Sequence, residues 1–247
     1  DVSLRKFIRE ANIDVFVPCG GLKDTINADN VAQFLELFKE LKIIIEGANV
    51  FFDDTARDFI AGKGILQIRD SSANKGGVIS SSIAEVLPGF LLGNRYEQIL
   101  VENQKQRISL VKSVFGIIET NAIRETEMLL SLNKKTEKHL HNLSMETSEM
   151  LFSLQEQLYG ILGLLKKRKN IILRILYSYV PDVLIKIIGI EKIFKILNNP
   201  DLKSYLDAII TKKIAQTALY KHADDWETFN TKIKQKPIEM IESLFIA

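Results

Sequence analysis

The sequence predicts an α/β fold in which a partial, doubly wound parallel sheet of about three strands precedes a mostly α-helical region. Residues 1–93 hold three short apolar runs that alternate with helical patterns. Nine of the 13 glycines also fall within residues 1–93, where turns between strands and helices need them. Residues 94–247 contain no persuasive strand, so we expect two domains, residues 1–93 and residues 94–247.

Three β-branched runs are the predicted strands. They are Asp14–Pro18, Lys42–Ile45 and Ile65–Ile68, and turn-forming residues follow each of them. Short apolar runs bounded by turn residues are typical of strands that are buried in a parallel sheet. Three strands make a small sheet, so we expect it to be part of something larger.

Helical patterns separate these runs, as crossover helices would. The first begins near Ala28 and runs through Phe38. The second begins at the cluster Asp53-Asp54-Thr55, whose carboxylates are good N-caps, and ends at Gly62. The third opens after Gly76-Gly77 and continues through Leu87.

The region from Asn94 onward has the pattern of a helical array. Apolar residues from Leu140 to Leu165 recur every three or four positions and form one continuous stripe. Pro181 and Pro200 each stand where a helix would begin, with an aspartate directly behind. With helices of about 11–14 residues, we expect about six to eight of them.

Composition restricts the classes of partner. A formal net charge of +2 is too near neutral to indicate a nucleic-acid partner, and we expect none. No stretch reaches the length of a membrane span, because charged residues and a proline interrupt the most apolar region, residues 171–196. We therefore expect no membrane partner. Cys19 is the only cysteine, which indicates a reducing compartment. We expect a cytoplasmic protein, with the mitochondrial matrix as the alternative.

Candidate ligand-binding residues follow the predicted strands, because ligands of doubly wound sheets bind beyond the carboxyl ends of the strands. Asn49 and Asn74 lie in two of these loops, and a carboxamide can both donate and accept a hydrogen bond. Gly76-Gly77 precedes a helix start, which favours an anion. Val78 and Ser81 are three residues apart on that helix and share a face. A nucleotide or small-anion site is one reading, and ordinary turn formation is the other.

Other residues have a functional and a structural interpretation. Cys19 could be a nucleophile, but no histidine lies near it in sequence, and a small buried side chain is the preferred reading. His139 and His141 are two apart on a predicted helix, which would direct them to different faces, so we expect no metal site. The basic run Lys166–Lys169 is interpreted as a solvated helix end.

Three segments together resemble the glutamate dehydrogenase family. One is the strand and loop Asp14–Gly21, with Asn27 behind it; the others are Lys42–Asn49, which ends in Glu-Gly-Ala-Asn, and Asp70–Val78, which contains Asn-x-Gly-Gly-Val. Lys75 stands where compact members carry a small residue. With Phe51-Phe52 and the triplet Ser80–Ser82, it makes the chain similar to the large NAD-dependent type.

The resemblance implies the second half of a dinucleotide-binding, Rossmann-like domain and a helical extension at the carboxyl end of the enzyme. It implies NAD as cofactor, a homo-oligomer, and reversible oxidative deamination of L-glutamate to 2-oxoglutarate and ammonium. By the same resemblance, Cys19, Asn49 and Asn74 lie at the cofactor, while Val78 contacts the methylenes of the substrate and Ser81 its side-chain carboxylate.

Parts of that enzyme are not found in this sequence. No Gly-x-Gly-x-x-Gly motif occurs, and the family's catalytic lysine and aspartate belong to a domain that would precede Asp1. We therefore expect no catalytic residue in this chain and no dehydrogenase activity from it alone. The first residue is Asp1, not methionine, which indicates a processed product or a piece. The alternative function is a non-catalytic helical interaction or regulatory module that retains dehydrogenase-like loops.

Overall fold

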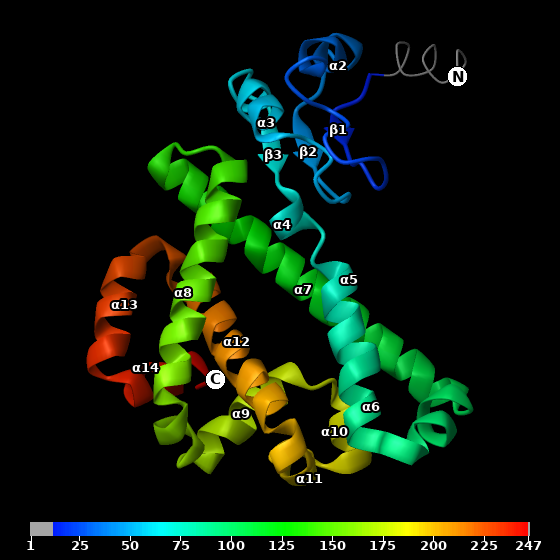
Figure 1. Ribbon diagram of the computed structural model, residues 1–247, viewed down its shortest axis with the longest axis vertical. Helices are drawn as coiled ribbons and strands as arrows, with labels where there is room; N and C mark the ends of the chain where they lie inside the picture. The colour runs from blue at the N-terminus through cyan, green and yellow to red at the C-terminus, as the bar shows by residue number, and fades with distance from the viewer. Residues whose placement is uncertain (1–11, 247) are drawn as a thin grey trace. The chain divides into compact units, whose positions relative to one another are not determined.

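The computed structural model describes residues 12–246, and contacts divide them into two compact units. The sheet unit runs to Lys75 and includes Leu129–Glu146. The helical unit holds Gly76–Met128 and the chain from Thr147 onward. The domain boundary that the sequence predicts between residues 93 and 94 stays a prediction. Figure 1 labels the elements of both units.

The sheet unit contains the predicted parallel sheet. Its strands are β1 (Val15–Phe16), β2 (Ile43–Ile45) and β3 (Leu66–Ile68), and they lie side by side in the order β1-β2-β3 (Figure 1). Both pairs are parallel, with Val15 opposite Ile43 and Ile44 opposite Gln67. The predicted fold class is therefore confirmed, and all three strand-end loops leave the sheet at the same edge.

Two crossover helices connect these strands. Helix α2 (Val31–Leu37) follows β1, and α3 (Asp54–Ala61) follows β2. The predicted N-cap of α3 is confirmed, because Asp53 accepts a hydrogen bond from the backbone N–H of Ala56 at 2.6 Å. Gly62 forms the predicted C-cap.

An aromatic cluster fills the core of the sheet unit. Its rings lie 4.9–6.2 Å apart, and they belong to Phe16, Phe34, Phe38, Phe51 and Phe52. Ile44 of β2 and Ile60 of α3 are fully buried beside them. Burial of each such side chain stabilises the fold by about 1.5–3 kcal/mol, so this core holds the strand ends in place.

Helical segments follow β3 directly. The residues expected to form a loop contain one helical turn, α4 (Asp70–Ala73). The predicted helix after the glycines is present, but it begins at Gly76 and changes its winding. It comprises α5 (Gly76–Ser80), a π-helical segment (Ser81–Val86) and α6 (Leu87–Leu92).

The expectation that no stretch could span a membrane was wrong in one respect. Helical residues 70–95 are long and apolar enough by length and composition alone, with a mean hydropathy of 1.4 in their most apolar window. Only 28% of that window is buried. A single helix of this kind is weak evidence, because core helices of water-soluble proteins meet the same criteria. Ile83, Leu87 and Leu91 on this stretch belong to the core of the helical unit.

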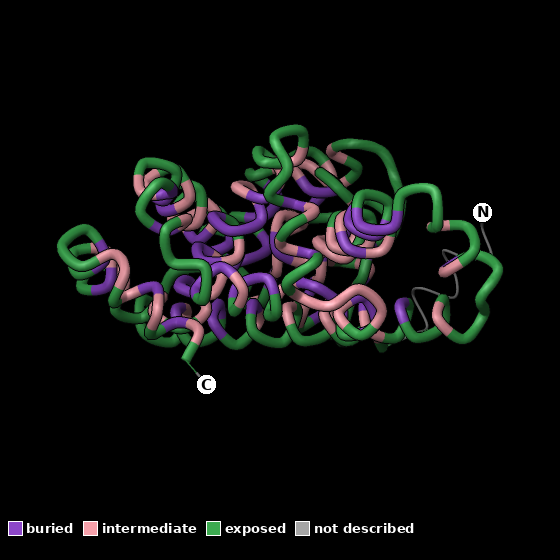
Figure 2. The backbone as a smooth tube through the Cα atoms, turned by 90° about the horizontal axis from the view of Figure 1, so that it is seen from below, coloured by how far each residue is buried: buried purple, intermediate pink, exposed green. Residues whose placement is uncertain are grey.

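The rest of the described chain is helical, as predicted. Eight α-helices follow Asn94 within the described residues: α7 (Gln104–Thr136), α8 (Leu140–Lys166), α9 (Lys169–Tyr179), α10 (Asp182–Ile188), α11 (Ile190–Leu197), α12 (Lys203–His222), α13 (Trp226–Gln235) and α14 (Pro237–Leu244). The predicted stripe on α8 is buried, including Leu143, Leu154 and Leu158. Buried residues concentrate where these helices face one another (Figure 2).

Candidate functional site

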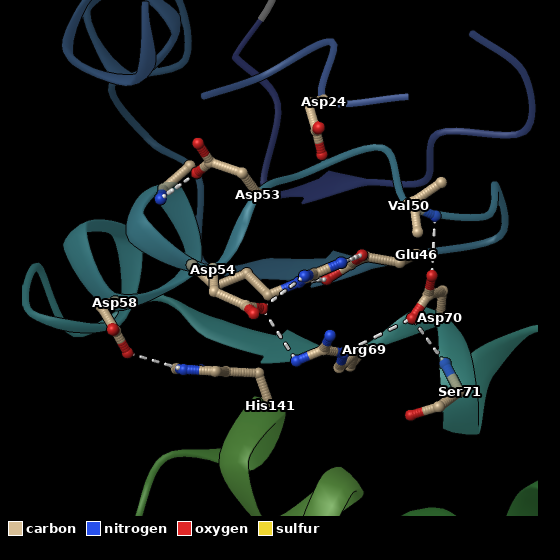
Figure 3. Close-up of polar contacts among 12 residues, drawn as sticks. Asp24, Glu46, Val50, Asp53, Asp54, Asp58, Arg69, Asp70, Ser71 and His141 are labelled. Atoms are coloured by element: carbon tan, nitrogen blue, oxygen red, sulfur yellow. Dashed lines mark hydrogen bonds and ion pairs between the residues drawn. The ribbon is translucent and has the colours of Figure 1, made fainter. Parts of the chain in front are cut away.

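The three loops that follow the strands are joined by backbone hydrogen bonds. The N–H of Ala48, in the loop after β2, donates to the carbonyl of Pro18, in the loop after β1, at 2.7 Å. The loop after β2 is also joined to the residues after β3, because the N–H of Val50 donates to the Asp70 carboxylate at 2.7 Å. Figure 3 shows this second contact and the neighbouring polar side chains. The loops therefore form one connected polar surface at the carboxyl edge of the sheet.

Asn49 and Asn74 meet on this surface. The side-chain amide of Asn74 donates a hydrogen bond to the side-chain oxygen of Asn49. Asn49 is exposed and Asn74 is half-buried. Each carboxamide has both a donor and an acceptor, and within the described chain neither the Asn49 nitrogen nor the Asn74 oxygen has another protein partner. The pair thus presents one donor and one acceptor side by side.

Tight packing of the first two loops explains the glycine at position 47. A Cβ atom on Gly47 would lie 3.0 Å from the Pro18 carbonyl oxygen and 3.2 Å from the sulfur of Cys19. The expectation that Cys19 is a buried filler was wrong, because Cys19 is exposed. Its sulfur lies against the backbone of Gly47 at the loop surface, and the aromatic core of the sheet unit is already filled by phenylalanine rings.

Val50 adopts an uncommon backbone conformation next to Asn49. Its φ is +47°, in the left-handed region that β-branched residues avoid. Two hydrogen bonds hold it there, one from its N–H to Asp70 and one from the N–H of Asp24 to its carbonyl at 2.8 Å. Strain of this kind costs about 1–3 kcal/mol and is concentrated at functional sites.

A buried ionic network lies beneath the loops, and sequence reasoning missed it. Glu46 is fully buried and accepts two hydrogen bonds from the Arg57 guanidinium, at 2.7 and 2.9 Å. Asp54 bridges Arg57 and Arg69 at 2.8 and 2.9 Å (Figure 3). Burial acts to lower the pKa of Arg57, but the neighbouring carboxylates outweigh it and raise the pKa. Arg57 therefore stays charged.

The network has a function in shaping the site. Glu46 is the first residue after β2, so its two bonds to α3 fix the direction in which the Gly47–Val50 loop leaves the sheet. Gln67 of β3 donates a third hydrogen bond to Glu46 at 3.0 Å. The signal in the sequence is a carboxylate directly after a buried strand, where an apolar or turn-forming residue is usual.

The sheet and its strand-end loops lie within a match to a known protein family. Residues 3–87 match the Glutamate/Leucine/Phenylalanine/Valine dehydrogenase family. Glutamate dehydrogenase 2 of Dictyostelium discoideum is 32% identical over 218 residues, which are 85% of this chain and 20% of that protein. The chain is a relative of the large glutamate dehydrogenases. The resemblance drawn from the sequence motifs is confirmed.

Two further relatives carry the cofactor in their names. The NAD-specific glutamate dehydrogenase of Saccharomyces cerevisiae is 31% identical over 227 residues, covering 87% of this chain and 20% of that protein. The probable NAD-specific enzyme of Schizosaccharomyces pombe is 32% identical over 225 residues, with the same two shares. The chain thus spans about a fifth of the length of these glutamate dehydrogenases. No solved structure matches it.

The two comparisons differ in how far along the chain they extend. The family match ends at residue 87, within α6, whereas similarity to the large glutamate dehydrogenases covers most of the chain. Most of the helical region is therefore shared with those long enzymes and lies outside the part that the family has in common.

Val78 and Ser81, the predicted substrate residues, lie at the start of the helical unit. Val78 is 62% exposed on α5, and Ser81 is exposed at the first position of the π-helical segment. Asn49 and Asn74 belong to the sheet unit. Convergence of these four side chains around one crevice stays a prediction.

The histidines differ from the sequence expectation in their geometry. His139 precedes α8, and its ring stacks on that of His141 with centroids 5.9 Å apart and planes 9° apart. The expectation that they face apart was wrong, because His139 is not helical. His141 is buried and shares a hydrogen bond of 3.0 Å with Asp58 (Figure 3). Among the described residues, no group of three or more possible metal ligands occurs.

Proposed function

We infer that the chain is part of an NAD-dependent glutamate dehydrogenase that catalyses reversible oxidative deamination of L-glutamate to 2-oxoglutarate and ammonium. The observation that carries this proposal is the contact between Asn49 and Asn74 on joined strand-end loops, inside the segment that matches the dehydrogenase family. The names of the long relatives support NAD as the cofactor.

The residues present fit the nicotinamide end of NAD. A nicotinamide carboxamide has one donor group and one acceptor, and the asparagine pair presents the complementary groups side by side. In this proposal Asn49 and Asn74 orient the carboxamide, and the loop of Cys19 passes beside the dinucleotide. When bound, NAD supplies the hydride acceptor for the oxidation.

The protein's own contribution in this chain is binding and orientation. Val78 would pack on the methylenes of glutamate, and the Ser81 hydroxyl would hydrogen-bond to its side-chain carboxylate. Proton transfer and the catalytic lysine and aspartate would come from a preceding domain. We therefore propose that this chain alone does not reduce NAD, and that the enzyme is a cytoplasmic homo-oligomer, with the mitochondrial matrix as the alternative compartment.

A longer protein provides the direct test. If the reading frame continues upstream of Asp1 with a glycine-rich turn and a lysine-bearing domain, that protein should reduce NAD in the presence of glutamate. Asn74→Ala and Asn49→Ala should each lower kcat/KM for NAD by about two- to tenfold, since one lost hydrogen bond is worth about 0.5–1.5 kcal/mol. Asn142→Ala, an exposed asparagine on α8, is the matched control and should change nothing.

Two results would contradict the proposal. One is NAD reduction by the 247-residue chain alone, which would place catalytic residues within it. The other is a longer protein in which both asparagine variants keep the kcat/KM of the control. A longer protein without any dehydrogenase activity would favour the non-catalytic interaction module.

A further inference from the structure

The helical unit contains a cavity of about 830 Å³ whose lining includes none of the residues of the proposed dehydrogenase site. Helices α7, α9 and α12 form its walls, together with the chain after α14. Figure 1 shows α12 passing through this unit beside α9. A concave site of this size accommodates a small organic ligand, since such sites measure about 300–1,000 Å³.

Basic side chains dominate the charge of this cavity. Four line it, from three different helices: Arg124 on α7, Arg174 on α9, and Lys213 and Lys221 on α12. Asp182 at the start of α10 is the single acidic residue of the lining. The four cations come from positions up to about a hundred residues apart in the chain, so their convergence is a product of the fold.

These cations have few partners in the protein. Among the described residues, neither Arg124, Arg174 nor Lys213 forms an ion pair, and the Lys221 ammonium donates to the carbonyl of Leu244 at 2.9 Å. Elsewhere in the same unit, Lys166 forms an ion pair with Asp207, and Lys169 forms one with Glu191 at 2.5 Å. Like charges that line one concave site repel one another, as Arg124 and Lys213 do, and a bound anion would offset this repulsion.

Lys213 is the least exposed of the four cations, since Arg124, Arg174 and Lys221 are exposed. It is half-buried, and burial lowers its pKa to about 8, with the charge of Arg124 acting in the same direction. Glu125, the neighbouring acid on α7, accepts a hydrogen bond from the Tyr220 hydroxyl at 2.9 Å and does not line the cavity. An anion would therefore supply the countercharge that the protein does not.

Neutral donors complete the lining. Thr120 and Asn121 of α7 lie on the same wall as Arg124, and Ser178 of α9 lies near Arg174 in sequence. Hydroxyl and amide groups beside guanidinium and ammonium groups are the usual partners of phosphate and carboxylate oxygens.

We propose that this cavity binds a small anion with at least two negative charges, through phosphate or carboxylate oxygens. Arg124, Arg174 and Lys213 hold the charges, and the hydroxyl and amide groups between them fix the orientation. The site shares no residue with the strand-end loops, and its proposal does not rest on the proposed dehydrogenase activity.

Calorimetric titration of the 247-residue chain tests the proposal, with pyrophosphate as the phosphate probe and citrate as the carboxylate probe at constant ionic strength. At least one probe should bind saturably with one site per chain. Tighter binding of pyrophosphate would identify a phosphate ligand, and tighter binding of citrate would identify a carboxylate ligand. At pH 8 binding should take up a proton, seen as a heat that depends on the buffer, because an anion raises the pKa of Lys213.

Variants of cavity residues test whether the heat measured in the titration comes from binding in the cavity. Arg174→Gln and Lys213→Gln should each weaken binding at least tenfold, whereas Lys203→Gln removes a charge from an exposed position on α12 and should leave it unchanged. Arg174 is exposed, so its replacement keeps the fold intact. The proposal is overturned by the absence of saturable binding for both probes, or by cavity variants that bind as well as Lys203→Gln.

Discussion

The sheet unit and the helical unit differ in whether their clustered basic side chains have carboxylate partners. Below the strand-end loops, Arg57 is almost fully buried and makes ion pairs with Glu46 and Asp54. Around the cavity of the helical unit, Arg124, Arg174 and Lys213 gather without a carboxylate partner in the described chain. A paired network fixes a loop in one conformation, whereas unpaired cations leave a site ready for an anion. The difference suggests structural support in one unit and ligand binding in the other.

The largest expected effect comes from breaking the paired network. Arg57→Met leaves the carboxylate of Glu46 buried without its ion-pair partner and with only the hydrogen bond from Gln67, which costs about 3–5 kcal/mol. Hydrogen exchange of the amides in residues 43–68 measures the loss within the sheet unit. Lys42→Met, which removes a solvent-exposed ion pair with Asp14, is the control and should leave this exchange unchanged. Equal exchange in both variants would show that the network does not support the loops.

Two glycine substitutions compare the packed loops with the open cavity. Gly47→Ala forces a Cβ to within 3.0 Å of the Pro18 carbonyl and should cost about 1–3 kcal/mol. Gly116→Ala, in the helix wall of the cavity, meets nothing within 4 Å and should stabilise α7 by about 1 kcal/mol. Hydrogen exchange within each unit measures both. If both substitutions stabilised their units, or both destabilised them, the predicted difference in packing between the loops and the cavity would be wrong.

The third prediction concerns how the unfolding free energy of the helical unit depends on pH through Lys213. Because its pKa of about 8 in the folded state lies below the ordinary 10.5, the folded state binds fewer protons than the unfolded state between these values. The unfolding free energy of the helical unit should therefore fall as pH is lowered from 10.5 to 8 and stay level below. Lys213→Met should remove this slope and add about 1–2 kcal/mol at pH 7. The fluorescence of Trp226, which lies in the same unit, reports its unfolding and provides the measurement. Destabilisation by Lys213→Met would contradict the prediction.

The smallest effect is expected for His141 in the sheet unit. Burial lowers its pKa, and the hydrogen bond with Asp58 only partly opposes this. Its contribution to the unfolding free energy is complete above the ordinary value of about 6.5 and decreases as pH falls below it. Hydrogen exchange in the sheet unit at pH 7 and pH 5 should show a pH dependence that His141→Gln reduces by about 1 kcal/mol or less. If His141→Gln leaves the pH dependence of hydrogen exchange unchanged, that dependence comes from other titratable groups.

Local patterns in the sequence predicted much of the fold. The three strands, the N-cap at Asp53 and the buried stripe of α8 depend on residues close together in the chain, whose spacing and capping chemistry are readable directly. The family resemblance had the same basis, since its motifs are short and ordered. Asn49 and Asn74 were identified because strand-end loops of a parallel sheet share an edge.

Only the tertiary structure decided which distant charges meet. Nothing near Glu46 in sequence indicates that Arg57 will reach it, nor that Arg124, Arg174 and Lys213 will surround one cavity. The exposure of Cys19 and the hydrogen bond of His141 with Asp58 likewise depend on packing between segments far apart in the chain. Hydrophobic periodicity specifies which face of a helix is buried, but the side chains on the other faces find their neighbours only when the helices have packed.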